Sequence, residues 1–371
     1  MYIKIKKIIN NIDIPFVIAS RFIGVAINFC HLELVSGSPL FSQEIPKQVR
    51  YDRKNKIKDF ARKGKRGIAI MFILVIVLNS NSLFAQLFGG GTGTKSSPYR
   101  IYTREHLEEL SVYVAASTTV KNWSYGKYFI LMNDIRDSVR TVIGNTWKNN
   151  GIDIPASKDF QGNFDGQGYK ITLAIEITKD TIHYGLFGQV SGDYIELKNI
   201  IVDGYIRGTV PSRSYIGGIV GQCYYRQENN KEYITNITIK NCINMADISI
   251  YYNGNYSVTG GIVAHVFLFE KDIVIIEDCI NMGNLEAIST SANATVSGIT
   301  TNNHCFGAPS LRGTPKINRC VNTGHIKGSN AAGIAANYNL NYNNDDCNIT
   351  NCINTGIIEG RVTSGGITNK K

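Results

Sequence analysis

Four cysteines recur at regular intervals in the second half of the chain, where thiols could bind a metal ion or pair as disulfides. A zinc site would need two close ligand pairs, and the close pair Cys347 and Cys352 has no partner pair after it. The later histidines are isolated and form no HExxH motif. We therefore expect no metal site and no cofactor. The residues concerned are Cys242, Cys279, Cys320 and Cys352, with His265, His304 and His325.

These cysteines are better explained as an interior packing ladder, because Ile200 occupies the same slot in an earlier copy of the motif. Of the eight cysteines, Cys30 lies in the N-terminal leader, which leaves seven. An odd number cannot be fully paired within one exported chain. One disulfide, either Cys347–Cys352 or Cys223–Cys305, stays open as an alternative.

Carboxylates are the second kind of side chain in the repeats that could carry out catalysis. Cleavage of a polysaccharide would need two carboxylates, or a base beside a cation, on neighbouring repeats. The candidates are Asp278, Asp345 and Asp346, with Arg319 in an adjacent repeat. Asp278 and Arg319 share a slot that also accepts Asn, so a plain surface ion pair is the competing interpretation. We expect no catalytic residues, and keep a polysaccharide lyase or hydrolase as the alternative function.

The cysteine slot belongs to an eight-residue phrase that recurs five times, at intervals of 32 to 42 residues: 199–206, 241–248, 278–285, 319–326 and 351–358. A second phrase, a small residue followed by Gly and Ile, lies between the copies at 217–219, 260–262, 297–299, 332–334 and 365–367. Such a period indicates stacked repeats. Short runs of Ile, Val and Thr between Gly and Asn corners favour strands. We predict an all-β coil in which each repeat pairs in parallel with the previous one.

The slots indicate which side chains face the interior. The slot before the cysteine holds Asn, Asp and Arg, so we expect it to face water. Cys242 and Ile243 both look buried, which requires a bend beside them, because neighbouring strand residues face opposite ways. We expect the Asn slot to form a corner of stacked amides. The predicted structural ladder comprises Ile200, Cys242, Cys279, Cys320, Cys352, Asn244, Asn281, Asn322, Asn354, Gly218, Gly261, Gly298, Gly333 and Gly366.

The N-terminal segment carries export signals. A basic stretch, the apolar run 67–78 and a small residue at Ala85 are typical of a signal peptide over 59–85, cleaved after Ala85. The run of 12 is short for a membrane span, so we expect no stable span after cleavage, with an uncleaved membrane anchor as the alternative. Residues 1–58 then lie upstream of it, which indicates a start codon assigned too early. Residues 86–102 are a flexible start and a first extended segment, 103–183 a cap and the first coils, and 184–371 the repeats. Within the cap, spacings of 3 and 4 predict a helix over 104–116 that covers the first coil.

The formal net charge of +10 is concentrated in the leader. Residues 1–70 hold 14 basic and 5 acidic residues, a balance of +9, and the remainder holds 25 basic and 24 acidic residues, a balance of +1. The repeat region therefore lacks the basic footprint of a nucleic-acid-binding domain.

The repeats resemble the GLUG-motif proteins. Gly185-Leu186-Phe187-Gly188 and residues 217–221 match the Gly-Leu-x-Gly-like core, and the Ile-x-Asn-Cys-x-Asn-x-Gly phrase is also typical. The resemblance covers roughly residues 90–371. It implies a right-handed parallel β-helix in a bacterial secreted or surface protein, similar to adhesins.

We therefore expect a non-catalytic exported protein that binds a glycan or a surface protein through loops between repeats. The glycine of the Gly-Ile phrase and the next cysteine slot are separated by 15 to 24 residues, a variable spacing. Insertions therefore collect on the side of the coil between these two slots. Tyrosines suit such contact surfaces. The chain ends within a repeat, so we expect a longer parent protein, or self-association through an open C-terminal coil. The tyrosines proposed for binding are Tyr224, Tyr225, Tyr251, Tyr252, Tyr338 and Tyr342.

Overall fold

The computed structural model describes residues 87–116, 121–144, 148–149, 152–153, 158–177, 182–210, 214–224, 226–228, 231–252, 257–268, 271–289, 294–302, 315–337 and 348–368. The predicted leader and signal peptide, residues 1–85, lie outside this part of the chain. So do Tyr225, Tyr338 and Tyr342 among the binding candidates.

A short strand and a helix precede the coils: β1 (Tyr99–Ile101) and α4 (Arg104–Ala115). The helix begins because the hydroxyl of Thr103 accepts a hydrogen bond from the backbone N–H of His106, while Nδ1 of His106 accepts one from the N–H of Tyr102. The histidine thus takes the place of the usual glutamate. Its buried face is Leu107, Leu110 and Val114. The predicted helix over 104–116 is confirmed, with its end one residue earlier.

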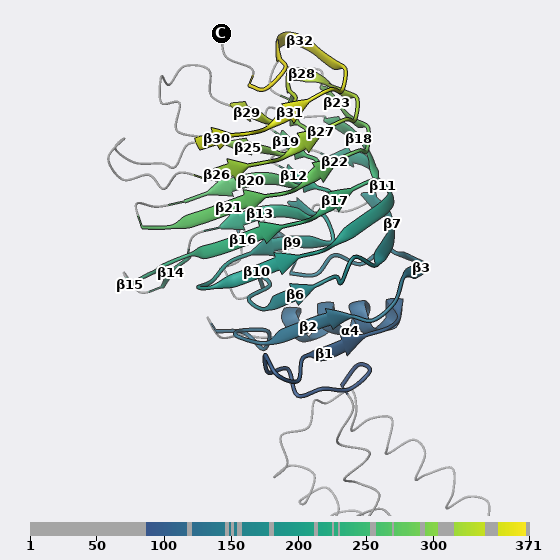
Figure 1. Ribbon diagram of the computed structural model, residues 1–371, viewed down its shortest axis with the longest axis vertical. Helices are drawn as coiled ribbons and strands as arrows, with labels where there is room; N and C mark the ends of the chain where they lie inside the picture. The colour runs from purple at the N-terminus through teal and green to yellow at the C-terminus, as the bar shows by residue number, and fades with distance from the viewer. Residues whose placement is uncertain are drawn as a thin grey trace, which may run out of the picture. The chain divides into compact units, whose positions relative to one another are not determined.

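The remaining strands form three sheets of parallel strands and two short hairpins (Figure 1). The eight-stranded sheet contains β1, β2 (Tyr128–Leu131), β6 (Asn163–Asp165), β10 (Ile195–Lys198), β16 (Asn236–Lys240), β21 (Ile273–Glu277), β26 (Lys316–Asn318) and β30 (Asn348–Thr350). The five-stranded sheet contains β9 (Phe187–Val190), β13 (Val220–Tyr224), β20 (Val263–Phe267), β25 (Thr300–Asn302) and β29 (Ala335–Asn337).

The 15-stranded sheet contains two sets of strands from each coil. Its first set is β3 (Ile135–Val139), β7 (Lys170–Ile177), β11 (Ile201–Val210), β17 (Ile243–Asn244), β18 (Asp247–Tyr252), β22 (Ile280–Asn281), β23 (Leu285–Ser289), β27 (Val321–Asn322), β28 (Ile326–Ala332), β31 (Ile353–Asn354) and β32 (Ile358–Gly365). Its second set is β8 (His183–Tyr184), β12 (Ser214–Gly217), β19 (Ser257–Gly260) and β24 (Ala294–Ser297). The hairpins are β4 (Lys148–Asn149) with β5 (Ile152–Asp153), and β14 (Arg226–Glu228) with β15 (Lys231–Tyr233).

Residues that occupy the same slot in successive repeats lie side by side. Asn244 pairs with Asn281, Asn281 with Asn322, and Asn322 with Asn354. Every pairing between strands of different coils is parallel, so the chain is a parallel β-helix, as predicted. In Figure 1 the eight-stranded sheet runs from left to right in front, and the chain returns behind it while climbing towards the C-terminus, which makes the coil right-handed.

The bend required beside the cysteine lies at the residue before it. Asn199, Asn241, Asp278, Arg319 and Asn351 all have φ between 51° and 54°, in the left-handed region. This conformation turns the chain between the eight-stranded and 15-stranded sheets and sends the next side chain into the core. The expectation that Ile243 is buried is wrong, because after the bend it points outward and is only half-buried.

Candidate functional site

The asparagine slot forms a continuous ladder of hydrogen bonds inside the coil. Asn244 donates from Nδ2 to Oδ1 of Asn281 at 2.8 Å, Asn281 to Asn322 at 2.7 Å, and Asn322 to Asn354 at 2.7 Å. The same nitrogen donates to the carbonyl two residues ahead, for example from Asn281 to Gly283 at 3.0 Å. The first three asparagines are fully buried. These amides satisfy the backbone at a corner where the strand ladder is interrupted.

The second phrase packs against this ladder. A Cβ on Gly218, Gly261, Gly298 or Gly333 would overlap the amide oxygen of the asparagine in the next coil, together with the carbonyl of the next glycine. Glycine is needed here for close approach rather than for a left-handed φ, since none of these four has a positive φ. The two phrases therefore recur together because they touch.

The cysteine slot is a ladder of thiols. Sγ of Cys279 donates to the carbonyl of Ile239 at 3.6 Å, and Sγ of Cys320 to that of Ile276 at 3.5 Å, each in the preceding coil. Burial holds the pKa of Cys279 well above its ordinary value, and a hydrogen bond with Cys279 raises the pKa of Cys320 to about 12. Thiols with pKa values this high stay protonated at neutral pH and are therefore poor nucleophiles.

Neither alternative disulfide is formed. Cys223 and Cys352 are free thiols, which excludes both Cys223–Cys305 and Cys347–Cys352 from this structure. Cys223 is fully buried in β13 among core side chains. Its burial raises the pKa of the thiol far above the ordinary value.

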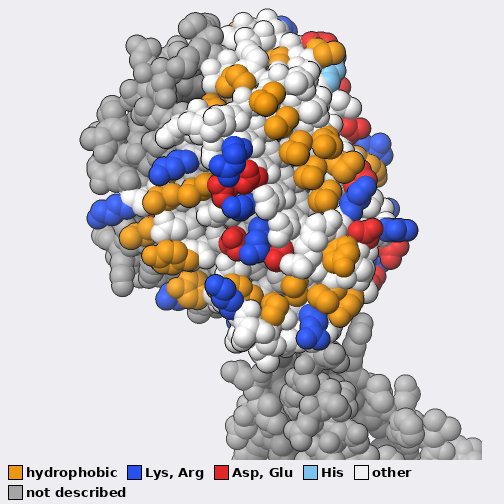
Figure 2. All heavy atoms as spheres, in the orientation of Figure 1, with side chains coloured by type: hydrophobic (Ala, Val, Ile, Leu, Met, Phe, Trp, Pro, Cys, Tyr) orange, Lys and Arg blue, Asp and Glu red, His pale blue; other side chains and the backbone are white. Residues whose placement is uncertain are grey.

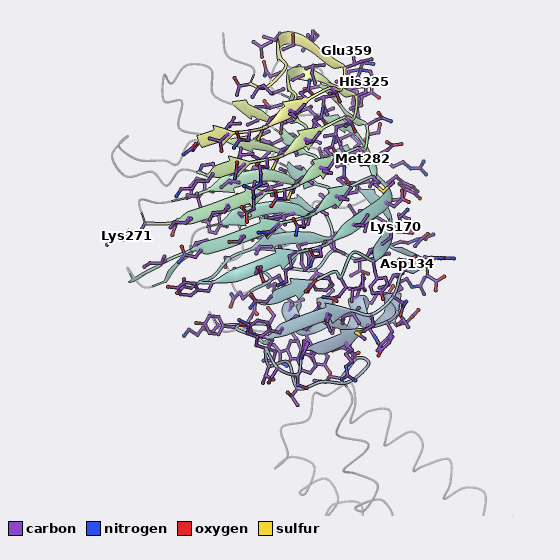
Figure 3. The ribbon with its side chains drawn as sticks, viewed as in Figure 1. Asp134, Lys170, Lys271, Met282, His325 and Glu359 are labelled. Atoms are coloured by element: carbon purple, nitrogen blue, oxygen red, sulfur yellow. The ribbon has the colours of Figure 1, made fainter. Side chains whose placement is uncertain are left out.

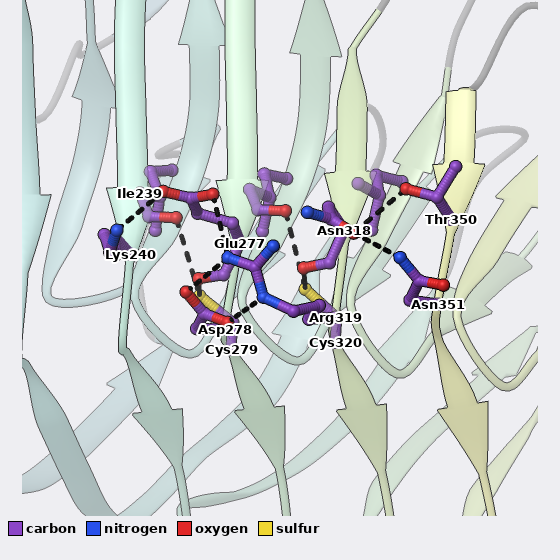
Figure 4. Close-up of polar contacts among 12 residues, drawn as sticks. Ile239, Lys240, Glu277, Asp278, Cys279, Asn318, Arg319, Cys320, Thr350 and Asn351 are labelled. Carbon is purple, nitrogen blue, oxygen red and sulfur yellow. Dashed lines mark hydrogen bonds and ion pairs between the residues drawn. The ribbon is translucent and has the colours of Figure 1, made fainter.

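The charged slot before the cysteine forms an ion-pair network on the outer surface (Figure 4). Arg319 holds Asp278 through two contacts, Nε to Oδ1 at 2.6 Å and a terminal nitrogen to Oδ2 at 2.8 Å. It also reaches Glu277 at 3.2 Å, and Lys240 contacts Glu277 at 3.0 Å. The hydrogen bond from Arg319 lowers the pKa of Asp278, which is the opposite of what a general acid needs. Asp345 and Asp346 lie outside the described residues.

The tyrosine candidates separate into different environments. Tyr252 is 1% exposed and its hydroxyl bonds Thr259 at 2.7 Å inside the core. Its proposed role as a loop contact is therefore wrong, because it is the inward residue at the end of an alternating strand. Tyr251, its neighbour, points outward and is 42% exposed. Tyr224 is half-buried at the end of β13.

Tyr224 belongs to a set of stacked rings that includes the buried His183 and His265, which we call the aromatic row. Its ring stacks on Phe267, with centroids 5.5 Å apart and planes 14° apart. Phe267 lies 6.0 Å from His265, which stacks on Tyr215 at 4.5 Å. Tyr215 stacks in turn on His183 at 5.3 Å. The row thus comprises Tyr224, Phe267, His265, Tyr215 and His183.

The corner at the Gly-Ile phrase brings these residues together. Tyr215 and His183 are paired on β12 and β8, before the corner, whereas His265 and Phe267 lie on β20, after it. Because Val266, which follows His265 on β20, points into the core, His265 and Phe267 face the other side of the strand. Tyr224 and Phe267 end their strands immediately before the connections to the next coil.

A chain of amides supports the row. Gln189 donates to Oε1 of Gln222 at 3.4 Å, and Gln222 donates from Nε2 to Nδ1 of His265 at 2.7 Å. Desolvation by burial lowers the pKa of His183 to about 4 and that of His265 to about 3. Both imidazoles are therefore neutral at physiological pH.

Part of this row could have been found from the sequence. Gln189, Gln222 and His265 each follow the Leu or Ile of the Gly-Ile phrase by three residues, so they occupy one slot. The rings from β12 and β20 could not be linked from sequence, because their contact depends on the angle between two sheets.

Across the described ranges, no group of three or more His, Cys, Asp or Glu side chains could hold a metal ion. Among the same residues no helix is long and apolar enough to cross a membrane.

Comparisons with known proteins give distant similarities. No family model matches the chain. A protein of Evansella cellulosilytica named "Putative Gly-rich membrane protein" is 28% identical over 159 residues, which are 42% of this chain and 17% of that protein. The chain thus matches a small part of that relative. A crystal structure of a "putative immunoglobulin A1 protease" from Bacteroides ovatus aligns over 77% of this chain and 81% of that one, with 15% identity and a TM-score of 0.40.

Proposed function

We propose that this β-helix is an exported, non-catalytic protein that binds a glycan on a cell surface through the aromatic row. The observation that carries the proposal is the stacked pair of Tyr224 and Phe267, both half-buried, at the strand ends that lead into the inter-repeat connections. Partly exposed rings that are held in place by stacking offer apolar contact area at little cost in conformational entropy. The C–H face of a pyranose ring packs on such a surface.

The polar groups beside the row suit a neutral ligand. Gln222 and Gln189 carry amides, and His265 and His183 are held neutral by burial. These four side chains are at most 5% exposed, so they fix the positions of the rings and place no charge beside the ligand. Export rests on the signal-peptide pattern at residues 59–85 and remains part of the proposal.

Binding to a panel of immobilised neutral and acidic polysaccharides tests this function. The double variant Tyr224→Ala/Phe267→Ala should bind the recognised glycan roughly 30-fold more weakly, at about 1 kcal/mol for each ring. Tyr251→Ala is the matched control, because its ring is exposed on a different sheet. Equal binding by the double variant and the control would refute the assignment.

The alternative of a polysaccharide lyase or hydrolase is measured on the same panel. Release of new reducing ends or of unsaturated sugars by the purified protein would replace the binding function with an enzymatic one. Binding to a protein ligand but to no glycan on the panel would point to a surface protein as the partner.

A further inference from the structure

Four consecutive coils present one continuous outward face, which we call the rung face. Each coil contributes five alternating residues, beginning with the left-handed residue before the cysteine slot. They are Asn241, Ile243, Met245, Asp247 and Ser249; Asp278, Ile280, Met282, Asn284 and Glu286; Arg319, Val321, Thr323, His325 and Lys327; and Asn351, Ile353, Thr355, Ile357 and Glu359.

The centre of the rung face is apolar. Ile243, Ile280, Val321 and Ile353 form a stripe of β-branched side chains in register across the four coils. Beside it Met282 is 45% exposed and Met245 38% exposed. Figure 2 shows hydrophobic side chains gathered on this side, and Figure 3 shows Met282 below His325 and Glu359 along the same side. A contiguous apolar strip at the surface marks a contact site.

The edges of the rung face carry opposite charges in a defined order. On one edge Asp278 and Arg319 occupy neighbouring coils, 2.6 Å apart from Oδ1 to Nε. On the other edge Glu286 and Lys327 occupy the same two coils, 2.8 Å apart from Oε1 to Nζ. Each edge therefore presents an acidic residue in the Cys279 coil and a basic residue in the Cys320 coil.

This order makes the face complementary to itself. A two-fold axis can run parallel to the strands, perpendicular to the coil axis and between the Cys279 and Cys320 coils. It places the Cys279 coil of one copy opposite the Cys320 coil of the second copy, with each residue at the same position along the strand. Asp278 then faces Arg319 of the second copy on one edge, and Glu286 faces Lys327 of the second copy on the other. Shifting the axis by one coil towards the N-terminus would instead bring Lys327 against Arg207, with like charges opposed.

The apolar stripe fits the same arrangement. The axis places Ile280 opposite Val321 of the second copy and Ile243 opposite Ile353 of the second copy. Rungs in a parallel coil repeat about every 4.8 Å, so side chains that interdigitate along the whole stripe need a partner with the same repeat. Another copy of this chain supplies that repeat.

We propose that the rung face pairs two copies of the chain in an antiparallel, face-to-face dimer centred between the Cys279 and Cys320 coils. Its twenty residues per copy meet the roughly 20 to 30 per side of a stable interface. The aromatic row lies on strands of other coil faces, so this pairing is independent of glycan binding.

The mass of the purified protein in solution is the first test. The wild-type chain should have twice the monomer mass, and Met282→Glu should reduce it to one chain by placing charges beside the apolar stripe. Lys327→Glu should also give monomers, and Glu286→Lys/Lys327→Glu should restore the dimer. Circular dichroism of each variant checks that the coil is intact. A monomeric wild type, or a dimer that survives both Met282→Glu and Lys327→Glu, overturns the proposal.

A pair of engineered cysteines tests the register. Met245→Cys/Thr355→Cys places thiols three rungs apart in one chain, about 14 Å, which is beyond disulfide reach. In the proposed dimer the same positions are opposed, so oxidation should yield covalent dimers on a non-reducing gel. Met245→Cys/Thr323→Cys is the control, because these positions are not opposed and lie about 10 Å apart in one chain. Equal cross-linking of both variants, or none of either, overturns the register.

Discussion

Gly261 lies against the amide oxygen of Asn281 in the next coil, closely enough that a Cβ would overlap it. The same contact joins Gly298 to Asn322 and Gly333 to Asn354. It explains why two phrases far apart in each repeat recur together. The glycine leaves the space that the asparagine fills, and the asparagine carries the hydrogen-bond ladder to the following coil.

Substituting this glycine should be costly. Gly261→Ala forces a Cβ against Asn281 and the carbonyl of Gly298, so the free energy of unfolding should fall by about 3 kcal/mol. Gly366→Ala is the matched control, because it occupies the same slot but a Cβ there meets no atom within 4 Å. Urea denaturation measures both, and equal losses would remove the packing explanation.

Breaking the ladder should destabilise the coil without a steric clash. Asn281→Ala removes the acceptor for Asn244 and the donor to Asn322 in a fully buried position. The free energy of unfolding should fall by about 2–3 kcal/mol. Lys316→Ala, an exposed substitution on β26 and outside the rung face, should change it by less than about 0.5 kcal/mol. Comparable values for the two variants would show that the ladder adds no stability.

Lowering the pH should reduce the free energy of unfolding because His183 and His265 are buried in their neutral form. The folded pKa values of about 4 for His183 and about 3 for His265 lie below the ordinary 6.5, so the unfolded chain binds more protons below pH 6.5. Stability should be fully present above pH 6.5 and fall as the pH drops towards 4, by about 1.4 kcal/mol per pH unit for each histidine. Protonation also prevents Nδ1 of His265 from accepting the hydrogen bond of Gln222.

The His183→Gln/His265→Gln variant isolates this effect. Its free energy of unfolding should depend less steeply on pH between 6.5 and 4 than that of the wild type, whatever its absolute stability. Parallel curves for the variant and the wild type would assign acid sensitivity to other groups.

Tyr252 should behave as a core residue. Tyr252→Phe removes the hydroxyl that bonds Thr259 at 2.7 Å and should lower the free energy of unfolding by about 1–2 kcal/mol. Glycan affinity should stay unchanged, because the ring is fully buried. A selective loss of binding without loss of stability would return Tyr252 to the candidate contacts.

The repeat phrases predicted the coil because stacking imposes one environment on each slot, and that constraint is visible in a single sequence. The backbone conformation of the slot before the cysteine could not be predicted in this way. The mixture of Asn, Asp and Arg in this slot indicated exposure, but the left-handed backbone at Arg319 has no sequence signature. Tyr251 and Tyr252 could not be separated either, since their orientation depends on the strand register. The aromatic row joins residues from different sheets, which no local spacing encodes.

The affinity of one recognised glycan for Phe267→Ala, set beside that for Tyr251→Ala, tests the central claim most directly. Phe267 can contribute to binding only through its ring. We expect a dissociation constant about fivefold higher for Phe267→Ala, from roughly 1 kcal/mol of lost stacking, and an unchanged constant for Tyr251→Ala. Unchanged affinity in Phe267→Ala, or an equal loss in both variants, would contradict it.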